Sequence, residues 1–161
     1  MIEIVIEEHA WRTAEPKVRA LVRAAAAATL KSEGRQGDIA ILLAGDSRLR
    51  ALNAAFRGTD KATNVLSFPG AVGGLGDIAL ALGVCVREAA EQRKPLAAHI
   101  QHLTAHGVLH LLGYDHQADA EAEVMEAKER VILAGLGIPD PYAPGGSREG
   151  DPAGEYGRHQ S

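Results

Sequence analysis

Residues 97–116 read AAHIQHLTAHGVLHLLGYDH and contain five histidines. Two of them, His106 and His110, are followed by Gly113 and then by His116. Apolar residues recur between the histidines at helical spacing, so we predict a helix from Ala97 to Leu112. His106 and His110 are four residues apart, about 6 Å along the helix axis, and therefore project from one face. Two imidazoles placed in this way are able to converge on a single metal ion.

The third histidine, His116, follows a glycine that is suited to reverse the chain. A straight helix would carry His116 about 15 Å from His106 along the axis. Gly113 has no Cβ and can take the left-handed conformation that ends helices, so we expect the chain to turn back there. Three nitrogen ligands with a fourth position left for water are typical of catalytic zinc sites. The sequence therefore predicts one Zn²⁺ ion per chain, bound by His106, His110 and His116.

His102 competes with this assignment because it also lies four residues before His106. A set of residues 102, 106 and 110 would extend about 12 Å along one helix face, too far for one ion with bonds of about 2.0 Å. The remaining histidines are therefore interpreted as packed or simply exposed side chains: His9, His99, His102 and His159.

The spacing of the three histidines is also that of the zinc ligands in a large class of metallopeptidases. Those enzymes carry their general base, a glutamate, directly after the first histidine, and here Gly107 occupies that position. Asp115, next to His116, is the nearest replacement for the base, and it is equally suited to orient an imidazole. The histidine spacing of these metallopeptidases is thus present, but their glutamate base is absent.

The rest of the chain predicts an α+β fold with a small mixed sheet of four strands and about five helices. Apolar alternation and short apolar runs predict strands at residues 2–6, 39–43, 64–68 and 77–82. A second helix is predicted to start after Thr13, with Pro16 in its first turn, and a third to be capped by Asp46 or Ser47 and to end at Arg57. Further helices are expected over residues 87–93 and 118–134, so the zinc site falls on a helix of the C-terminal half and the turn that follows it.

Composition limits the classes of protein that this chain can represent. Its 161 residues, 46% hydrophobic and 24% charged, are typical of one soluble domain. The single cysteine, Cys85, excludes an intrachain disulfide and a cysteine zinc cage, and no disulfide-linked partner is expected. The start lacks a signal-peptide pattern, and no apolar stretch approaches the ~20 residues that span a bilayer. We therefore expect a cytoplasmic protein with no membrane partner.

The charge distribution excludes a broad nucleic-acid binder but leaves room for a local site. A net charge of −4 and an aromatic content of 4% disfavour nonspecific binding and rows of stacked bases. Residues 1–112 carry 13 basic against 11 acidic residues, whereas residues 113–161 carry 4 against 10. The acidic excess is thus confined to the C-terminal part.

Three blocks of the sequence resemble a known family. Residues 106–116 are similar to the signature of the YbeY family, bacterial zinc-dependent endoribonucleases of ribosomal RNA maturation. Residues 52–69, LNAAFRGTDKATNVLSFP, resemble a second block of that family and residues 76–78 a third, in the same order. The resemblance covers about residues 37–136. The sequence departs from the family pattern at Phe56, Ala62 and Asn64, where tyrosine, proline and aspartate are common.

The resemblance implies a function and assigns roles to residues. It implies a single-strand-specific, metal-dependent endoribonuclease that acts in 3′-end maturation of small-subunit ribosomal RNA and in ribosome quality control. Its partners would be ribosomal RNA and the small ribosomal subunit, the three histidines of residues 106–116 would hold zinc, and Arg57 would be the functional arginine of the cleft. We accordingly expect one metallohydrolase domain over residues 1–137 and a flexible tail rich in proline and glycine over residues 138–161.

Arg57 also suits the chemistry that the resemblance implies. A guanidinium donates two parallel hydrogen bonds to phosphate oxygens, and Arg48, Arg50 and Lys61 would extend a basic track. From spacing alone, a salt bridge from Arg57 to Asp60 explains the arginine equally well. Two alternatives from other classes stay open: a metallopeptidase-like hydrolase, and a noncatalytic ribosome assembly factor in which zinc is structural.

Overall fold

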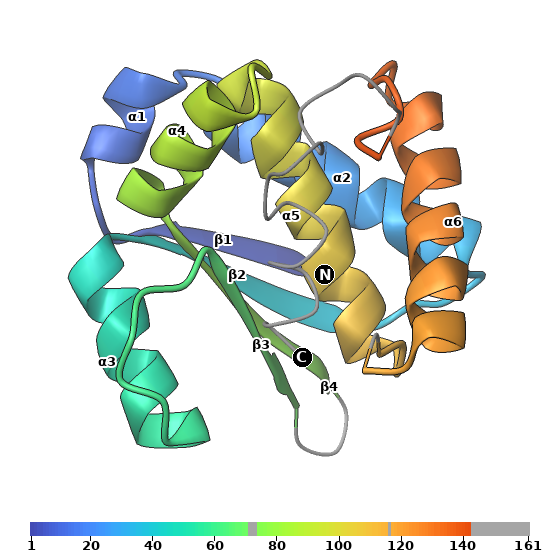
Figure 1. Ribbon diagram of the computed structural model, residues 1–161, viewed down its shortest axis with the longest axis horizontal. Coiled ribbons are helices and arrows are strands. Elements are labelled where there is room, and N and C mark those ends of the chain that lie inside the picture. The colour runs from blue at the N-terminus through green and yellow to red at the C-terminus, as the bar shows by residue number, and fades with distance from the viewer. Residues whose placement is uncertain (71–73, 116, 143–161) are drawn as a thin grey trace.

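The structure is a computed structural model that describes residues 1–70, 74–115 and 117–142. Its centre is a four-stranded mixed sheet with the strand order β1-β2-β4-β3 (Figure 1). The strands β1 (Ile2–Ile6), β2 (Asp38–Ala44) and β4 (Gly74–Ala81) are parallel, and β3 (Val65–Pro69) runs antiparallel to β4 along one edge. The predicted α+β fold with a mixed sheet of four strands is confirmed.

Helices lie on both faces of this sheet. In the described ranges they are α1 (Ala10–Ala14), α2 (Val18–Ser32), α3 (Asp46–Arg57), α4 (Leu82–Glu91), α5 (Leu96–Leu111) and α6 (Asp119–Gly135). Figure 1 shows α2 and α5 on one face, α6 packed outside them, and α3 against the other face. Because α5 lies between the sheet and α6, most of its side chains are buried. None of the helices in these ranges is long and apolar enough to cross a membrane.

The main core fills the space between the sheet and the helices α2 and α5. Alternate residues of β2 enter it, and Ile39, Ile41 and Leu43 are at most 2% exposed. Trp11 of α1 is fully buried at one end of the core, where its indole N–H donates to the Ala44 carbonyl at 2.8 Å. A buried indole needs such a partner, so this bond fixes α1 against β2.

The helix predicted after Thr13 is present as α2, but its predicted start, with Pro16 in the first turn, is wrong because the separate helix α1 comes before it. α1 ends at Ala14 and α2 begins at Val18. Between them Glu15 is extended, with φ −146° and ψ 94°. A proline disfavours the helical conformation of the residue before it, which explains the break.

Asp46 caps a different helix from the one predicted. The N-cap of α3 is Gly45, and the Oδ1 atom of Asp46 instead accepts the backbone N–H of Val84 at 3.0 Å. Val84 lies in the first turn of α4, where backbone N–H groups lack partners within the helix. α4 therefore starts at Leu82, directly after β4, and the predicted start at Arg87 is too late.

Buried residues occur beyond residue 137, the predicted domain end, and the division into a domain and a tail stays a prediction. Tyr142 is 4% exposed, and its hydroxyl donates to a carboxylate oxygen of Glu129 at 2.6 Å. Packing therefore continues to at least Tyr142. The rest of the predicted tail, residues 143–161, lies outside the described residues.

Gly76 lies in β4 opposite Pro69 of β3, in a backbone conformation that disfavours a side chain. Its φ is +143°, and a Cβ at this position would overlap the carbonyl oxygen of Phe68. We expect Gly76→Ala to lower the free energy of unfolding by about 2 kcal/mol or more, measured by urea denaturation. Gly135→Ala is the control: no atom lies within 4 Å of its added Cβ, so this variant should be neutral or slightly more stable. Equal stability of the two variants would contradict the prediction.

Candidate active site

The predicted histidine pair lies on the last turns of α5. The Nε2 atoms of His106 and His110 are 3.1 Å apart, and the ring centroids are 4.6 Å apart. In a tetrahedral zinc site with bonds of 2.0–2.1 Å, two ligand nitrogens are about 3.3 Å apart. The two rings therefore have the separation that a shared metal ion requires.

The chain reverses directly after this pair, as predicted. Gly113 has φ +104°, and its N–H donates to the His110 carbonyl at 3.0 Å. The Tyr114 N–H donates to the Leu109 carbonyl at 3.1 Å, which completes the end of the helix. The turn brings Tyr114 and Asp115 back beside His110.

The third predicted ligand, His116, lies outside the described residues, and its metal-binding role stays a prediction. Among the residues that the structure describes, no group of three His, Cys, Asp or Glu side chains has the arrangement of a metal site. The metal-binding side chains that the structure describes at this site are therefore His106 and His110.

Burial keeps His110 in the form that binds metals. Loss of solvent, followed by the charge of His106, lowers the pKa of His110 to about 3. A hydrogen bond with the Tyr114 backbone acts in the opposite direction but does not reverse the shift. The ring is therefore neutral at neutral pH, and neutral imidazole is the ligand form.

Both predicted catalytic residues line the same pocket as His110. This pocket has a volume of about 240 Å³, and its walls come from the end of α3, from β3 and from the turn after α5. Arg57 contributes from α3, and Asp115 from the turn. Residues from three separate parts of the sequence thus meet beside His110, one of the predicted zinc ligands.

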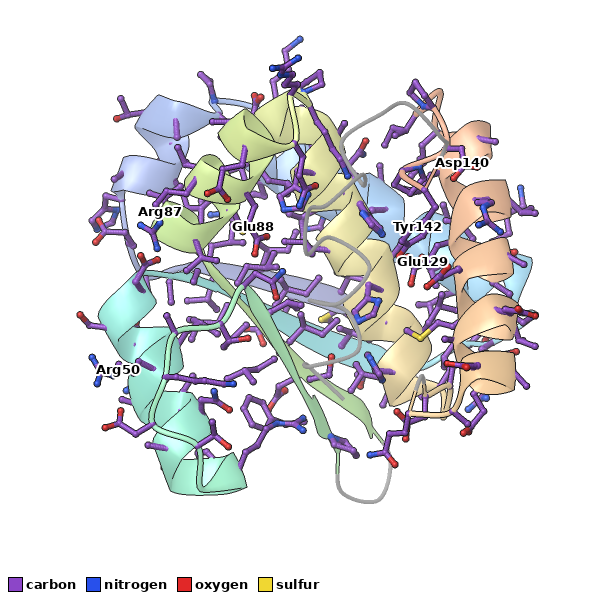
Figure 2. All side chains as sticks on the ribbon, viewed as in Figure 1. Arg50, Arg87, Glu88, Glu129, Asp140 and Tyr142 are labelled. Atoms are coloured by element: carbon purple, nitrogen blue, oxygen red, sulfur yellow. The ribbon has the colours of Figure 1, made fainter. Side chains whose placement is uncertain are left out.

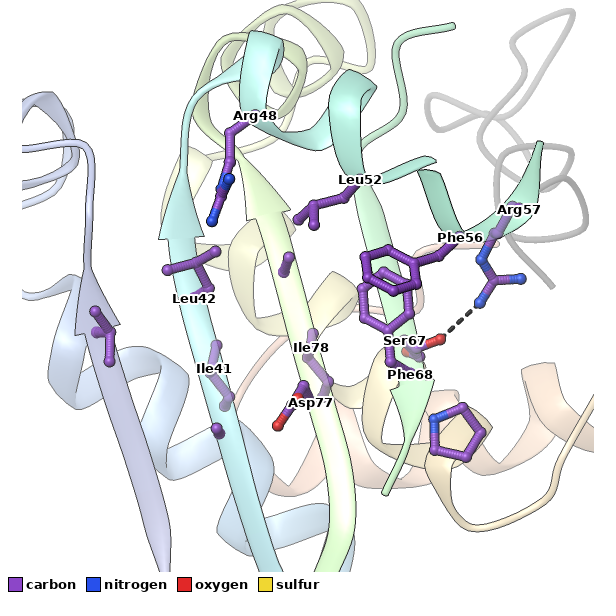
Figure 3. A pocket seen from close by; sticks show the side chains of 14 residues that line it. Ile41, Leu42, Arg48, Leu52, Phe56, Arg57, Ser67, Phe68, Asp77 and Ile78 are labelled. Atoms are coloured by element: carbon purple, nitrogen blue, oxygen red, sulfur yellow. Dashed lines mark hydrogen bonds between the residues drawn. The ribbon is translucent and has the colours of Figure 1, made fainter. Parts of the chain in front are cut away.

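Arg57 is held at the pocket wall by the edge strand β3. Its Nη2 atom donates to the Ser67 carbonyl at 2.6 Å, and its guanidinium carbon lies 5.8 Å from the centre of the Phe68 ring (Figure 3). Asp60, the alternative partner, instead pairs with Arg50 at 2.8 Å. Arg57 thus contacts β3, and Asp60 pairs with Arg50.

A larger groove adjoins the pocket on the face of the sheet that carries α3 (Figure 3). It has a volume of about 740 Å³ and shares Arg57, Ser67 and Pro69 with the smaller pocket. Its floor is mainly apolar, and Phe56, which is 69% exposed, meets the Phe68 ring edge-on at 5.4 Å. Arg48 also lines the groove, whereas Arg50 and Lys61 of the predicted basic track do not.

Comparison with known proteins identifies the family. The sequence model described as Endoribonuclease YbeY matches residues 3–137. This chain belongs to the YbeY endoribonuclease family. The predicted resemblance is confirmed, and it extends over nearly the whole described chain.

Curated relatives agree with this assignment. Endoribonuclease YbeY of Rhodopseudomonas palustris (strain BisB5) is 48% identical over 157 residues, covering 88% of this chain and 80% of the relative. Endoribonuclease YbeY of Maricaulis maris (strain MCS10) is 50% identical over 145 residues, covering 88% and 91%. The solution structure of TM1509 from Thermotoga maritima has a TM-score of 0.60 and 24% identity, covering 92% of this chain and 100% of the other. That structure supports the fold alone.

In this YbeY-family chain, Gly107 lies where α5 touches the sheet. A Cβ at this position would be 3.1 Å from Cγ2 of Ile78 and 3.2 Å from Oγ of Ser67. The Ser67 hydroxyl also donates to the Gly107 carbonyl at 3.1 Å. A glutamate here would press against the Ile78 and Ser67 side chains, so the position of the peptidase base faces the sheet.

The sequence analysis missed one member of the site, Glu129 of α6. One of its oxygens accepts a hydrogen bond from Nδ1 of His106 at 2.8 Å, and the other from Nε2 of His102 at 2.6 Å. His102, interpreted as a packed histidine, is 5% exposed and belongs to this network. Burial alone would raise the pKa of Glu129, but His106 and His102 together lower it below its usual range. The carboxylate is therefore ionised at neutral pH.

The sequence did carry a signal for Glu129. It lies on the buried stripe of α6 together with Ala122, Met125 and Ile132, at helical spacing. A carboxylate on such a stripe is costly to bury unless it is paired, so its presence indicates a buried partner.

Proposed function

We propose that this protein is a metal-dependent endoribonuclease that cleaves single-stranded RNA in the pocket lined by Arg57, His110 and Asp115. The observation that carries the proposal is this pocket, in which a guanidinium and a carboxylate lie beside the paired histidines. Membership of the YbeY family supports the reaction, since the curated relatives are named endoribonucleases. We further propose that the substrate is ribosomal RNA near the 3′ end of the small-subunit RNA, processed in the cytoplasm.

The proposed metal is one zinc ion held by His106, His110 and His116. The described pair fits it, because both rings present Nε2 at 3.1 Å from each other and His106 is backed by a carboxylate at Nδ1. When bound, zinc supplies Lewis acidity that makes water nucleophilic near neutral pH.

The protein side chains provide the remaining functions. Arg57 donates hydrogen bonds to the oxygens of the scissile phosphate and stabilises the negative charge that develops there. Asp115, which lines the same pocket, accepts the proton from the attacking water. The groove beside Arg57 binds the nucleotides that follow, and its apolar floor suits the faces of unpaired bases.

The test is cleavage of one RNA sequence offered both as a single strand and as a duplex. We expect zinc-dependent cleavage of the single strand and much slower cleavage of the duplex, with no release of peptides from casein. Cleavage of casein alone would favour the metallopeptidase. Binding to small ribosomal subunits that survives loss of the zinc ligands, without cleavage of any RNA, would favour the assembly factor.

Phe56 provides a prediction that is specific to the groove. A base stacked on an exposed ring contributes about 1–3 kcal/mol, so Phe56→Ala is expected to raise KM at least about fivefold for a single-stranded oligonucleotide. Phe56→Tyr keeps the ring and should retain the KM of the unchanged protein. Val124→Ala on α6 is a control, since Val124 is also exposed but does not line the groove. A KM that is insensitive to the ring would show that bases do not bind there.

A further inference from the structure

Glu129 is buried between α5 and α6, where most neighbouring side chains are apolar. It is 1% exposed and lies near Tyr142 (Figure 2). Met125, Ile132 and Leu133 of the same helix pack with α5 around it. Removing a carboxylate from water costs several kcal/mol unless hydrogen bonds replace the lost hydration. The hydrogen bonds that replace the hydration of Glu129 therefore show which groups this carboxylate acts on.

The two carboxylate oxygens have different partners. Oε2 accepts the Nδ1–H of His106 at 2.8 Å. Oε1 accepts Nε2–H of His102 and the hydroxyl of Tyr142, each at 2.6 Å. Oε2 thus binds His106 of the histidine pair, and Oε1 links the carboxylate to α5 and to the segment after α6.

The contact at Oε2 determines which nitrogen of His106 carries the proton. A carboxylate oxygen accepts hydrogen bonds, so Nδ1 of His106 is the donor in this contact and Nε2 is the nitrogen left for a metal. That Nε2 atom faces Nε2 of His110 at 3.1 Å. A histidine whose remote N–H is held by a carboxylate is oriented and made more basic as a metal ligand.

Tyr142 is itself fixed by the segment that carries it. Its backbone N–H donates to Asp140 at 2.8 Å, Asp140 pairs with Arg130 at 3.2 Å, and the Arg130 guanidinium lies 5.5 Å from the Tyr142 ring centre. Arg130 directly follows Glu129 on α6. Tyr142 lies beyond residue 137, where the match to the family model ends.

We propose that Glu129 is a positioning residue for the metal centre, and that Tyr142 holds the Glu129 carboxylate so that the segment after α6 becomes part of that centre. The proposal rests on the proposed function, because it requires a metal on His106. It extends that function by adding the buried carboxylate and a C-terminal tyrosine to the groups that determine metal affinity.

The full-length chain offers a matched control for Glu129. Glu88 is also 1% exposed, and it accepts a hydrogen bond from the buried His99 at 2.8 Å, but it does not touch the histidine pair. Glu88→Gln and Glu129→Gln therefore each replace a buried carboxyl group that is hydrogen-bonded to a histidine by an amide. A purely structural role for Glu129 predicts that both variants lose stability and that both bind zinc with the affinity of the unchanged protein.

The experiment measures zinc affinity by competition with a chromophoric chelator, together with urea denaturation of the metal-free proteins. We expect Glu129→Gln to weaken zinc binding about 10- to 100-fold and Tyr142→Phe roughly threefold, while Glu88→Gln binds zinc as the unchanged protein does. Unchanged zinc affinity in both Glu129→Gln and Tyr142→Phe would overturn the proposal. If Glu129→Gln fails to fold, the result with Tyr142→Phe decides.

A second measurement needs no metal. Nitrogen NMR of the metal-free unchanged protein should show His106 protonated at Nδ1, and a ring protonated at Nε2 would overturn the positioning role. Failure of the unchanged protein to bind zinc, with His106 protonated at Nδ1, would instead count against the proposed function. The two failures are thus distinguishable.

Discussion

His110→Ala is expected to eliminate stoichiometric zinc and to lower the rate of RNA cleavage by roughly 10³-fold or more. The ring contributes one of the two Nε2 atoms that face each other at 3.1 Å, so its loss leaves one described imidazole at the predicted zinc site. A metal that activates water contributes several kcal/mol to the stability of the transition state, which corresponds to this change in rate. Elemental analysis of the purified protein and a single-turnover cleavage assay measure the two effects.

The control for this variant is His9→Ala. His9 is an exposed histidine that precedes α1, so its removal changes the same residue type away from the pocket. It should retain zinc and cleavage. Full zinc content in His110→Ala would contradict the assignment of this histidine as a ligand.

Elements with local signals could be predicted from the sequence. The alternation of Ile2, Ile4 and Ile6 with Glu3, Val5 and Glu7 predicted β1. The strand forms there, with Ile4 buried and Glu3 and Val5 exposed. Gly113 predicted the end of α5, and it has the positive φ that reverses the chain there. Such signals suffice because hydrophobic period and glycine conformation are properties of the segment itself.

Elements determined by distant contacts could not be predicted in this way. The start of α4 depends on Asp46, whose carboxylate accepts the backbone N–H of Val84. The two residues are 38 positions apart in the sequence. The groove beside Arg57 exists because β4 inserts between β2 and β3, and the order of strands in a sheet is not a local property. The same limit explains why Glu129 was missed, since it reaches His106 from another helix.

Asn64 shows how the structure explains a departure from the family pattern. Its Nδ2 atom donates to both oxygens of Glu88, at 3.0 and 3.3 Å, and both residues are 1% exposed. The amide thus supplies a donor to a buried carboxylate, whereas the aspartate that is common at this position would bring a second acceptor.

Arg57→Ala is expected to lower kcat for RNA cleavage by about 10²- to 10³-fold while zinc content stays unchanged. In the proposed reaction the guanidinium stabilises charge that develops on the phosphate, and loss of one such donor typically has an effect of this size. Arg57→Lys should recover only part of the rate, because an ammonium retains the charge but not the paired N–H groups of the guanidinium. Single-turnover cleavage and elemental analysis measure rate and metal separately.

Arg57 also joins α3 to β3 through the Ser67 carbonyl, so a structural effect has to be separated from a catalytic one. Arg50→Ala is the matched control: it removes another arginine from α3, one that pairs with Asp60 and does not line the pocket. This variant should cleave RNA at the rate of the unchanged protein. Urea denaturation of both variants then shows whether a loss of cleavage rate comes with a loss of stability. A folded, zinc-loaded Arg57→Ala protein with undiminished cleavage would reduce Arg57 to a link between helix and strand, whereas a loss of rate without a comparable loss of stability assigns it to the phosphate.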